Sequence, residues 1–265
     1  MSQQLQLLAH KIYEFCGLNY FTNITSLELK VSRRLNHLQV SSLMEYDIYL
    51  NTHPEEWWQL VEELTINETY FFREEKQLYL YMQHILPSLK NETPIRVWSA
   101  ACSTGEEPYT LAMLSHEAGF TSNQQLQIVA TDINTKVLQR AKRGIYNKRS
   151  LSFRRIEEQW LMKYFLATPS TYEVMDSVKQ QVSFQYLNLL QQRDIEAFEE
   201  FDVIFCRNVF IYFDEETIYK IISSFYKVLK PGGYLFLGHA ESITKFKNIG
   251  FETINQNGTF YYRKG

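Results

Sequence analysis

From about residue 95 onward, short apolar runs alternate with longer amphipathic segments. The apolar runs lie at 95–101, 128–132, 182–187, 201–206 and 234–237. Helical segments fit 107–118, 135–143 and 215–229, and the sequence KPGG (230–233) is expected to stop the last of them. This alternation is typical of a parallel sheet whose strands are connected by helices. We therefore predict an α/β fold with a doubly wound, mostly parallel sheet.

Two further features belong to this part of the chain. A β-hairpin is expected near the C-terminus around Asn257-Gly258, a pair that favours a tight turn. The stretch from about 145 to 181 is too long for a simple connection between a helix and a strand. We expect it to form a small inserted subdomain, with a helix at 156–165 and a short strand at 172–175.

The N-terminal part of the chain shows helical periodicity. Two apolar stripes with helical spacing precede residue 40: Leu5, Leu8, Ile12 and Phe15, then Leu27, Val31, Leu35 and Leu38. We expect the second helix to begin after a Ser26 cap. A third helix is predicted to begin at Thr52, which forms a capping box with Glu55. These features predict an all-helical domain over 1–72 and an α/β domain over 73–265.

Composition excludes several classes of partner. The formal net charge is −3, so overall charge favours neither a nucleic acid nor an anionic membrane. No apolar run approaches the roughly 20 residues that span a bilayer, and the N-terminus lacks a signal-peptide pattern. Cys16, Cys102 and Cys206 are odd in number and widely spaced, which favours a reducing cytosol. The histidines show no metal-ligand spacing, so we expect the protein to use no metal. We also expect it to be cytoplasmic and to act as a monomer.

The end of the first predicted strand is a candidate ligand site, because ligands of open parallel sheets bind beyond the carboxyl ends of the strands. Gly105 is the only glycine there, and Ala101 and Ser103 stand where a phosphate-binding pattern would have more. S-adenosylmethionine contains no phosphate, so small residues would suffice to let it approach the backbone. Glu106 could then accept a hydrogen bond from its ammonium group. The alternative is an ordinary turn with acidic residues at a helix N-terminus.

Asp132 closes the second predicted strand. A carboxylate at this position can accept hydrogen bonds from both ribose hydroxyls of an adenosine. The same side chain could instead cap the helix that begins near Thr135, because Asp is favoured at N-caps. The two interpretations are compatible with each other.

Seven motifs follow one another along the chain: NETYFFRE (67–74), VWSAACSTGEEPY (97–109), ATDIN (130–134), FQYLNLL (184–190), FDVIFCRNVFIYF (201–213), LKPGG (229–233) and GHAES (238–242). In this combination they closely resemble the CheR-type chemotaxis receptor methyltransferases, a family of protein-glutamate O-methyltransferases. The resemblance covers nearly the whole chain. It implies a Rossmann-like class I methyltransferase domain, a helical N-terminal domain and a small β-subdomain inserted near 151–181.

The resemblance also implies a set of residues that hold S-adenosylmethionine: Asn67, Thr69, Arg73, Glu106, Asp132, Asn188, Leu189, Arg207 and Asn208. The first three would reach over the cofactor from the linker, to its amino-acid carboxylate and its adenosine. Glu106 and Asp132 would keep the roles given above. The Asn188-Leu189 pair would flank the adenine, and the Arg207-Asn208 pair would line the end where the methyl group is transferred.

Methyl transfer to a carboxylate needs no general base, because a glutamate side chain ordinarily has a pKa near ~4.3 and is already ionised at neutral pH. The absence of a Ser-His-Asp or Cys-His constellation agrees with this chemistry. Catalysis would then depend on holding the reacting groups in line. Tyr212, with Arg207 beside the methyl-transfer end, is the candidate to position the glutamate, because the family has a functional tyrosine there. The alternative for Tyr212 is a core aromatic within FIYF (210–213).

Basic residues of the second N-terminal helix form a candidate partner surface. Lys30, Arg33, Arg34 and His37 have helical spacing and are expected to lie opposite the apolar stripe. Such a cationic ridge suits docking onto the cytoplasmic helical domain of a chemoreceptor, whose methylation sites are glutamates; the alternative is a solvated helix face. Many relatives also grip a receptor tail peptide through a glycine-containing loop. The loop here, LATPST (166–171), has no glycine, which weighs against tail binding.

Two other functions would use the same cofactor motifs. One is a methyltransferase with a different protein or a small-molecule acceptor, and the other is a non-catalytic, cofactor-binding signalling module. The N-terminal helices and the cationic ridge favour a receptor as acceptor, and the presence of Arg207, Asn208 and Tyr212 favours catalysis. The sequence therefore predicts transfer of a methyl group from S-adenosylmethionine to glutamate side chains of a chemoreceptor.

Overall fold

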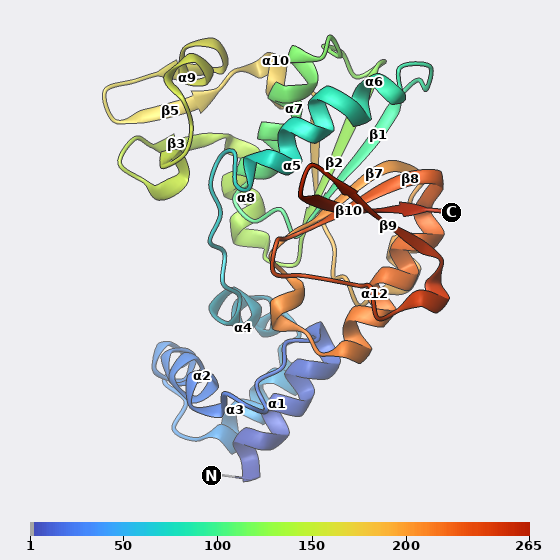
Figure 1. Ribbon diagram of the computed structural model, residues 1–265. Helices are drawn as coiled ribbons and strands as arrows, with labels where there is room; N and C mark the ends of the chain where they lie inside the picture. The colour runs from blue at the N-terminus through green and yellow to red at the C-terminus, as the bar shows by residue number, and fades with distance from the viewer. Residues whose placement is uncertain (1–2) are drawn as a thin grey trace.

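The five predicted apolar runs and the predicted hairpin form a seven-stranded sheet in the computed structural model, which describes residues 3–265 (Figure 1). Its strands are β1 (Ile95–Ala100), β2 (Leu126–Asp132), β6 (Val182–Tyr186), β7 (Phe201–Cys206), β8 (Leu229–Leu237), β9 (Phe251–Gln256) and β10 (Thr259–Lys264). The strand order is β6-β2-β1-β7-β8-β10-β9. The first five of these strands are parallel, and the predicted hairpin adds β10 and β9 antiparallel at β8. The predicted doubly wound, mostly parallel sheet is confirmed.

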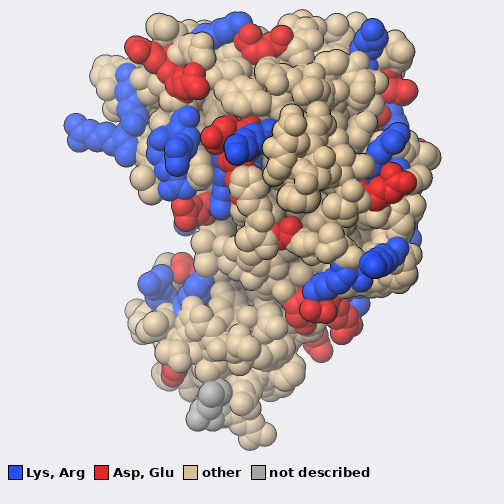
Figure 2. Space-filling model, in the orientation of Figure 1, with Lys and Arg blue, Asp and Glu red and all other residues tan. Residues whose placement is uncertain are grey.

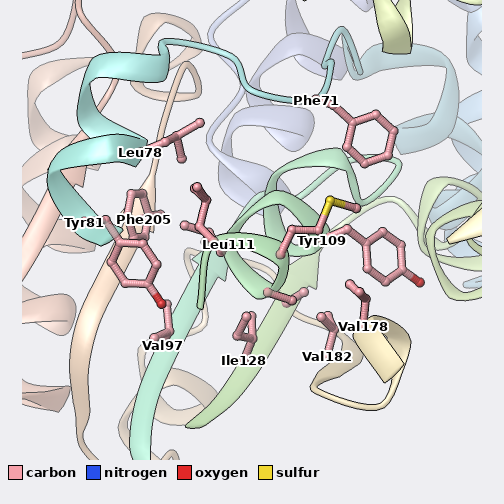
Figure 3. Close-up of a cluster of buried hydrophobic side chains, with 14 of the residues drawn as sticks. Phe71, Leu78, Tyr81, Val97, Tyr109, Leu111, Ile128, Val178, Val182 and Phe205 are labelled. Atoms are coloured by element: carbon pink, nitrogen blue, oxygen red, sulfur yellow. The ribbon is translucent and has the colours of Figure 1, made fainter. Parts of the chain in front are cut away.

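Alternating side chains of the central strands enter two separate cores, because successive side chains of a strand point to opposite faces. Val97 of β1 and Phe205 of β7 belong to one buried cluster, whereas Trp98 and Ile204 belong to the other. Figure 3 shows the first cluster, where Tyr81 and Leu111 pack from the covering helices toward Val97 and Phe205. The sheet is therefore buried on both faces, as continuous apolar strands require.

Helices cover both faces of this sheet. They are α5 (Glu75–Leu80), the π-helical turn η1 (Tyr81–Ile85), α6 (Leu86–Ser88), α7 (Glu106–Glu117), α8 (Thr135–Arg143), α11 (Gln192–Glu196) and α12 (Glu215–Val228). Residues of α5, η1, α6, α7 and α8 enter the first core, and residues of α11 and α12 enter the second. The helical stretch from α5 to α6 was not predicted. The short helical turns η3 (Phe210–Tyr212) and η4 (Lys247–Ile249) lie in loops.

The KPGG segment does not act only as a helix stop. Helix α12 ends at Val228, and β8 begins with the next residue, which pairs with Phe201. Pairing with β7 resumes only at Tyr234, opposite Val203, so the segment between forms an irregular bulge in β8. The Lys264 ammonium donates to the carbonyl oxygens of Tyr226 and Leu229 at 2.7 and 2.6 Å. These bonds satisfy carbonyls that a helix end leaves without partners.

The stretch from 145 to 181 forms a three-stranded antiparallel sheet with two helices, called the insert below. Its elements are β3 (Ile145–Asn147), η2 (Leu151–Phe153), α9 (Glu158–Tyr164), β4 (Phe165–Ala167), β5 (Thr171–Val174) and α10 (Asp176–Lys179). The strand order is β3-β5-β4. The predicted helix and strand correspond to α9 and β5, whereas β3 and β4 are three-residue strands that their sequences did not reveal.

The N-terminal region consists of the helices α1 (Gln3–Cys16), α2 (Ile24–Leu38), α3 (Leu43–Thr52) and α4 (Glu56–Leu64). They lie at one end of the molecule in Figure 1 and share an apolar core of their own. Helix α3 was not predicted. Within residues 3–265, no helix is both long enough and apolar enough to cross a membrane.

Both predicted caps of these helices are wrong. Ser26 lies inside α2, which begins after Asn23. Thr52 is the last residue of α3, and its hydroxyl donates to the carbonyl oxygens of Ile48 and Tyr49 instead of capping the next helix. Helix α4 begins after Glu55, with no side-chain cap. At Thr52 the local capping pattern was overridden by the unforeseen helix α3, which ends at that residue.

A buried ion pair crosses the helical core. The Arg34 guanidinium donates two hydrogen bonds to the Glu56 carboxylate, at 2.8 and 2.6 Å, and the Tyr46 hydroxyl donates a third at 2.9 Å. The two charged side chains are only 10% and 4% exposed. Arg34 is therefore not part of a solvated cationic ridge, and that prediction is wrong for this residue.

Removing one partner of this pair should strongly destabilise the protein. Glu56→Ala is expected to lower the free energy of unfolding by about 3–5 kcal/mol, because it leaves the Arg34 charge buried without a counter-charge. Urea unfolding followed by circular dichroism measures this change. Glu55→Ala is the matched control, because its side chain is exposed and makes no capping bond. Equal stability of the two variants would contradict a structural role for the ion pair.

Candidate active site

A cavity of about 510 Å³ lies beyond the carboxyl ends of the central strands. Its floor is formed by residues that follow β1, β2, β6 and β7: Ala101, Cys102, Ser103, Asp132, Ile133, Leu187, Asn188, Leu189, Arg207, Asn208 and Val209. The rest of its lining comes from the segment between Cys16 and Lys30, from Leu64–Thr69 with Arg73, from Glu107 of α7 and from the η3 turn with Phe213. The sheet reverses its direction of winding between β1 and β7, which is where an open α/β sheet binds its ligands.

The backbone around this cavity is strained. Ala101, Ser103 and Asn208 have φ angles of +58°, +50° and +61°, and Phe72 and Glu74 have angles of +61° and +56°. Residues with a Cβ adopt this left-handed conformation at a free-energy cost of about 1–3 kcal/mol each, and they keep it only where surrounding contacts enforce it. Such residues gather at ligand sites, so their clustering here marks the cavity as functional.

Asp132 supplies contacts that enforce this geometry. One carboxylate oxygen accepts the backbone N–H of Ser103 at 2.8 Å, and the other accepts the N–H of Asn134 at 2.8 Å. Burial raises the pKa of Asp132 to about 6, although the backbone N–H groups oppose this shift. The N-cap of α8 is Asn134, whose side chain accepts from the N–H groups of Lys136 and Val137. The alternative interpretation of Asp132 as the helix cap is therefore wrong.

Glu107, and not Glu106, faces the cavity. Glu106 lines a smaller, neighbouring cavity, and its carboxylate accepts hydrogen bonds from Thr104 and Ser152 at 2.7 and 2.8 Å. Neighbouring residues of a helix point about 100° apart, so only one of two adjacent glutamates can face a given site. The Glu107 carboxylate accepts from the Ser99 hydroxyl at 2.8 Å. Burial raises the pKa of Glu107, and the nearby Arg207 guanidinium opposes the shift.

Arg207 lies at the centre of a buried charge network. Its Nε atom is 3.4 Å from Glu107 and 3.9 Å from Glu74, and its Nη2 donates to the carbonyl oxygen of Arg73. Its Nε and Nη1 are buried and make no hydrogen bond within residues 3–265, and the same holds for Oδ1 of Asn208. Buried polar groups in native proteins are nearly always paired. These unpaired atoms lie just beneath the surface of the cavity, in two residues that line it.

Asn208 is fixed by two acidic side chains. Its side-chain amide donates to Glu74 at 3.0 Å. The Glu241 carboxylate accepts the backbone N–H groups of Asn208, Phe210 and Gly238, at 2.8, 2.7 and 2.6 Å. The sequence had pointed to neither Glu74 nor Glu241, although they belong to the motifs NETYFFRE (67–74) and GHAES (238–242). Their roles depend on contacts between distant segments, which one sequence does not reveal.

The predicted linker residues Asn67, Thr69 and Arg73 all line the cavity. The carbonyl oxygen of Asn67 accepts the Ser103 hydroxyl at 2.9 Å, which ties this segment to the turn after β1. The Arg73 guanidinium donates to the carbonyl oxygen of Glu68 at 2.9 Å. The segment is thus held over the cavity by its backbone, and its polar side chains remain beside the open volume.

Two further predicted residues line the cavity near the N-terminal helices. The Asn188 amide donates to the carbonyl oxygen of Phe15 at 2.6 Å, so this side chain also ties α1 to the sheet. Tyr212 is half-buried in η3, and its hydroxyl makes no hydrogen bond within the described chain. Burial raises the pKa of this hydroxyl, and the neighbouring Arg73 charge opposes the shift. The hydroxyl is therefore neutral and free to donate.

The predicted docking residues do not act as one surface. Lys30 is half-buried on the cavity wall, where its ammonium donates to the carbonyl oxygen of Leu64 at 2.6 Å. Arg34 is buried with Glu56. Only Arg33 and His37 are exposed as expected. Residues 1–66 moreover contain eight acidic and four basic side chains, so the helical region as a whole is not cationic.

The geometry agrees with the comparison with known proteins. Residues 67–259 match the model of the CheR methyltransferase SAM-binding domain. The chain belongs to the CheR methyltransferase family. It is 36% identical over 244 residues to chemotaxis protein methyltransferase 2 of Vibrio cholerae, which covers 89% of this chain and 84% of that protein. It is 37% identical over 227 residues to the chemotaxis protein methyltransferase of Escherichia coli, which covers 82% and 77%. Chemotaxis protein methyltransferase 1 of Pseudomonas aeruginosa is 37% identical over 241 residues, 86% of each chain.

The cavity of this CheR-family chain fits S-adenosylmethionine, its cofactor. Its volume lies within the usual range of small-ligand sites, about 300–1,000 Å³. Carboxylates on the wall, from Asp132 and Glu107, can accept from hydroxyl or ammonium groups, and Arg73 offers a cation for a carboxylate. Arg207 and Asn208 add a guanidinium and an amide to the same lining. The lining therefore offers both the hydrogen-bond donors and the acceptors that a nucleoside joined to an amino acid requires.

Cofactor affinity should depend on the protonation of Asp132. As pH falls through about 6, this carboxylate becomes neutral, and charge-assisted bonds worth about 1.5–3 kcal/mol each are lost. We expect affinity for S-adenosylhomocysteine to fall by up to about tenfold per pH unit below that value. Calorimetry between pH 5 and 8 measures this profile. Asp132→Asn should bind weakly with a flatter profile, and an unchanged profile would assign the titration to another group such as Glu107.

The stability of the ligand-free protein should depend on pH in the opposite direction to the cofactor affinity. The pKa of Asp132 in the folded protein, about 6, exceeds that of aspartate in an unfolded chain, about 3.9. Its contribution to stability is therefore fully present below about pH 4 and is lost as pH rises through 6. Comparing thermal unfolding of the protein and of Asp132→Asn over this range separates this contribution from other titrating groups.

Proposed function

We propose that this S-adenosylmethionine-dependent methyltransferase esterifies glutamate side chains of a chemoreceptor. The observation that carries the proposal is a single cavity that joins a carboxylate suited to ribose, Asp132, with a free hydroxyl, that of Tyr212. Membership of the CheR family and the names of the relatives, chemotaxis protein methyltransferases, support the same acceptor. We also propose that the protein acts in the cytoplasm as a monomer.

Binding of the cofactor is assigned to the residues that line the cavity. Asp132 accepts from the ribose hydroxyls, Asn188 and Leu189 flank the adenine, and Arg73 pairs with the amino-acid carboxylate. Glu107 takes the place of Glu106 as acceptor for the ammonium group, because it is the glutamate that reaches the cavity. When bound, S-adenosylmethionine supplies a methyl group activated on a sulfonium centre.

The residues of the chain then position the acceptor and exclude water. A glutamate carboxylate is ionised at neutral pH and attacks without a general base. The Tyr212 hydroxyl donates one hydrogen bond to the carboxylate oxygen that does not react, which orients the other. Arg73, close enough to affect the pKa of Tyr212, adds positive charge beside it. Holding reactants in one geometry can contribute about 7–11 kcal/mol to lowering the barrier, so alignment can carry much of the catalysis.

The roles of the two parts of the chain follow from this assignment. We propose an N-terminal helical domain over 1–72 and a methyltransferase domain over 73–265, with the insert inside the latter. Residues of the first, among them Tyr20 and Lys30, complete the wall of a cavity whose floor belongs to the second. The acceptor glutamate would therefore enter between the two parts, where both can contact it.

One assay decides between receptor methylation and its alternatives. The purified protein is incubated with radiolabelled S-adenosylmethionine and membranes of the host organism. Base-labile methyl label on a band of receptor size is the expected result, because glutamate methyl esters hydrolyse in base. Label on a small molecule or on another protein would redirect the acceptor. Cofactor binding without any label transfer would indicate a non-catalytic module.

Replacing Tyr212 should separate turnover from binding. Tyr212→Phe is expected to lower turnover about tenfold to hundredfold, which corresponds to a lost hydrogen bond to a charged group of about 1.5–3 kcal/mol. Calorimetry should show nearly unchanged cofactor affinity, since the hydroxyl meets the acceptor. Tyr20→Phe is the control, because its hydroxyl on the same cavity already donates to the carbonyl oxygen of Leu64 at 2.9 Å. If both variants retain full turnover, Tyr212 has a structural role only.

A further inference from the structure

One stretch of the chain has a charge opposite to that of the whole protein. Residues 136–155 contain eight Lys and Arg side chains and no Asp or Glu, in a protein whose formal net charge is −3. The stretch comprises most of α8, the strand β3 and the turn η2. A cationic segment of this length repels itself, so its charge is stabilised only by solvent, salt or a partner of opposite sign.

Most basic side chains of this stretch form no ion pair with another described residue. Only Arg154 forms an ion pair within residues 3–265, with Glu68 at 2.7 Å. Elsewhere in the chain many basic side chains are paired with acids, for example Lys227 with Glu196 and Lys230 with Asp202. Six of the remaining side chains make up what we call the α8 basic surface: Lys136, Arg140, Arg143, Lys148, Arg149 and Arg155. All are exposed except Lys148, which is half-exposed beside the Tyr172 ring.

These side chains gather on one side of the molecule. Lys136, Arg140 and Arg143 are spaced by four and three residues, so they share one face of α8. The others extend the surface along the insert. Figure 2 shows Lys and Arg side chains gathered where Figure 1 places α8 and β3. A surface of one sign over several elements can attract a polyanionic partner and orient it during encounter.

The α8 basic surface adjoins the active site. Lys136 and Arg140 line the smaller cavity, of about 410 Å³, together with Leu151 and Ser152 of the insert. Residues 67–69 line both this cavity and the larger one. A segment bound across α8 would therefore lie next to the strip of chain that covers the cofactor cavity. This placement distinguishes the surface from isolated surface charges elsewhere.

We propose that the α8 basic surface docks an acidic polypeptide segment of the methyl-accepting protein. The proposal rests on the proposed function, because a substrate whose reacting groups are glutamates carries negative charge at and around its methylation sites. The exposed apolar side chains of Ile145 and Leu151, 47% and 65% exposed, stand among the cations. Mixed charge and apolar contact suits a polypeptide better than a nucleic acid backbone, which offers mainly phosphates.

The α8 basic surface provides the positive charge that the helical region lacks. Residues 1–66 are net acidic, and two of their four basic side chains are engaged within the structure: Lys30 donates to the carbonyl oxygen of Leu64, and Arg34 pairs with Glu56. Electrostatic attraction of an acidic partner toward the cavity must therefore come from another part of the chain. At about 0.15 M salt such attraction extends over roughly 8 Å, so it acts once the partner is close and sets its register.

The test neutralises three cations on α8 without reversing charge near a helix end. The variant is Lys136→Gln with Arg140→Gln and Arg143→Gln. A matched control removes the same charge elsewhere, as Lys90→Gln with Arg193→Gln and Lys247→Gln, all exposed and without ion pairs within the described residues. The probe is the purified cytoplasmic fragment of a chemoreceptor from the same host. Methyl transfer and direct binding by fluorescence anisotropy are both measured, from about 0.05 to 0.3 M salt.

We expect the α8 variant to raise the apparent KM for the fragment about tenfold at low salt and to weaken binding equally. Its kcat, its affinity for S-adenosylhomocysteine and its melting temperature should match those of the control variant. The difference should shrink as salt increases, because screening removes the same attraction. An unchanged KM and unchanged binding in the α8 variant would overturn the proposal.

Two further outcomes are distinguishable. If the unaltered protein binds cofactor but never methylates the fragment, the proposed function fails, and the binding data alone then decide the role of the surface. Vesicles containing phosphatidylglycerol and a random-sequence DNA duplex serve as competing polyanions. Loss of binding to either of these in the α8 variant, with fragment binding intact, would assign the surface to a membrane or a nucleic acid and overturn the proposal.

Discussion

Two carboxylates, one buried and one half-buried, hold the strand ends on which the active site is built. Asp132, at the end of β2, accepts backbone N–H groups from the turn after β1 and from the residue before α8. Glu241, beyond β8, accepts three N–H groups, two of them from the turn after β7. Both turns contain non-glycine residues in left-handed conformations. The carboxylates offset that strain, because hydrogen bonds to charged groups contribute about 1.5–3 kcal/mol each.

The insert contributes to the same framework. Phe71, fully buried in the segment that precedes α5, packs against Phe153 and Phe165 of the insert, and its backbone N–H donates to the carbonyl oxygen of Ser152 at 2.9 Å. The Tyr146 hydroxyl donates to the carbonyl oxygen of Thr104 at 2.7 Å. Aromatic residues of the insert thus belong to the core that supports one face of the sheet. The insert holds the cofactor-covering segment in place in addition to presenting a surface.

Sequence reasoning identified the parts of this protein that repeat a regular pattern. The short apolar runs predicted the strands of the sheet, and the small residues that follow them predicted the position of the cavity. Sequence reasoning failed where two neighbouring residues differ only in the direction of their side chains. It also failed where the two partners of a contact are far apart in the sequence. Glu106 and Glu107 are chemically identical, so only the orientation of α7 distinguishes them. Arg34 could have been recognised: its spacing from Leu27 and Val31 puts it on the buried face of α2, but its partner Glu56 comes from another helix.

The helical region contacts the α/β domain next to Tyr212, the residue proposed to position the acceptor. The N–H of Asn19 donates to the carbonyl oxygen of Tyr212 at 3.3 Å, and the Tyr13 hydroxyl donates to Asp214, the N-cap of α12, at 2.7 Å. Gly17 fits against Thr217 so closely that an added Cβ would stand 3.0 Å from its methyl group. Chimaeras that exchange the N-terminal helices between relatives would thereby also alter the surroundings of Tyr212. Recombination between relatives therefore has to preserve the 212–217 segment along with the helices that it supports, because the two parts fix each other's position.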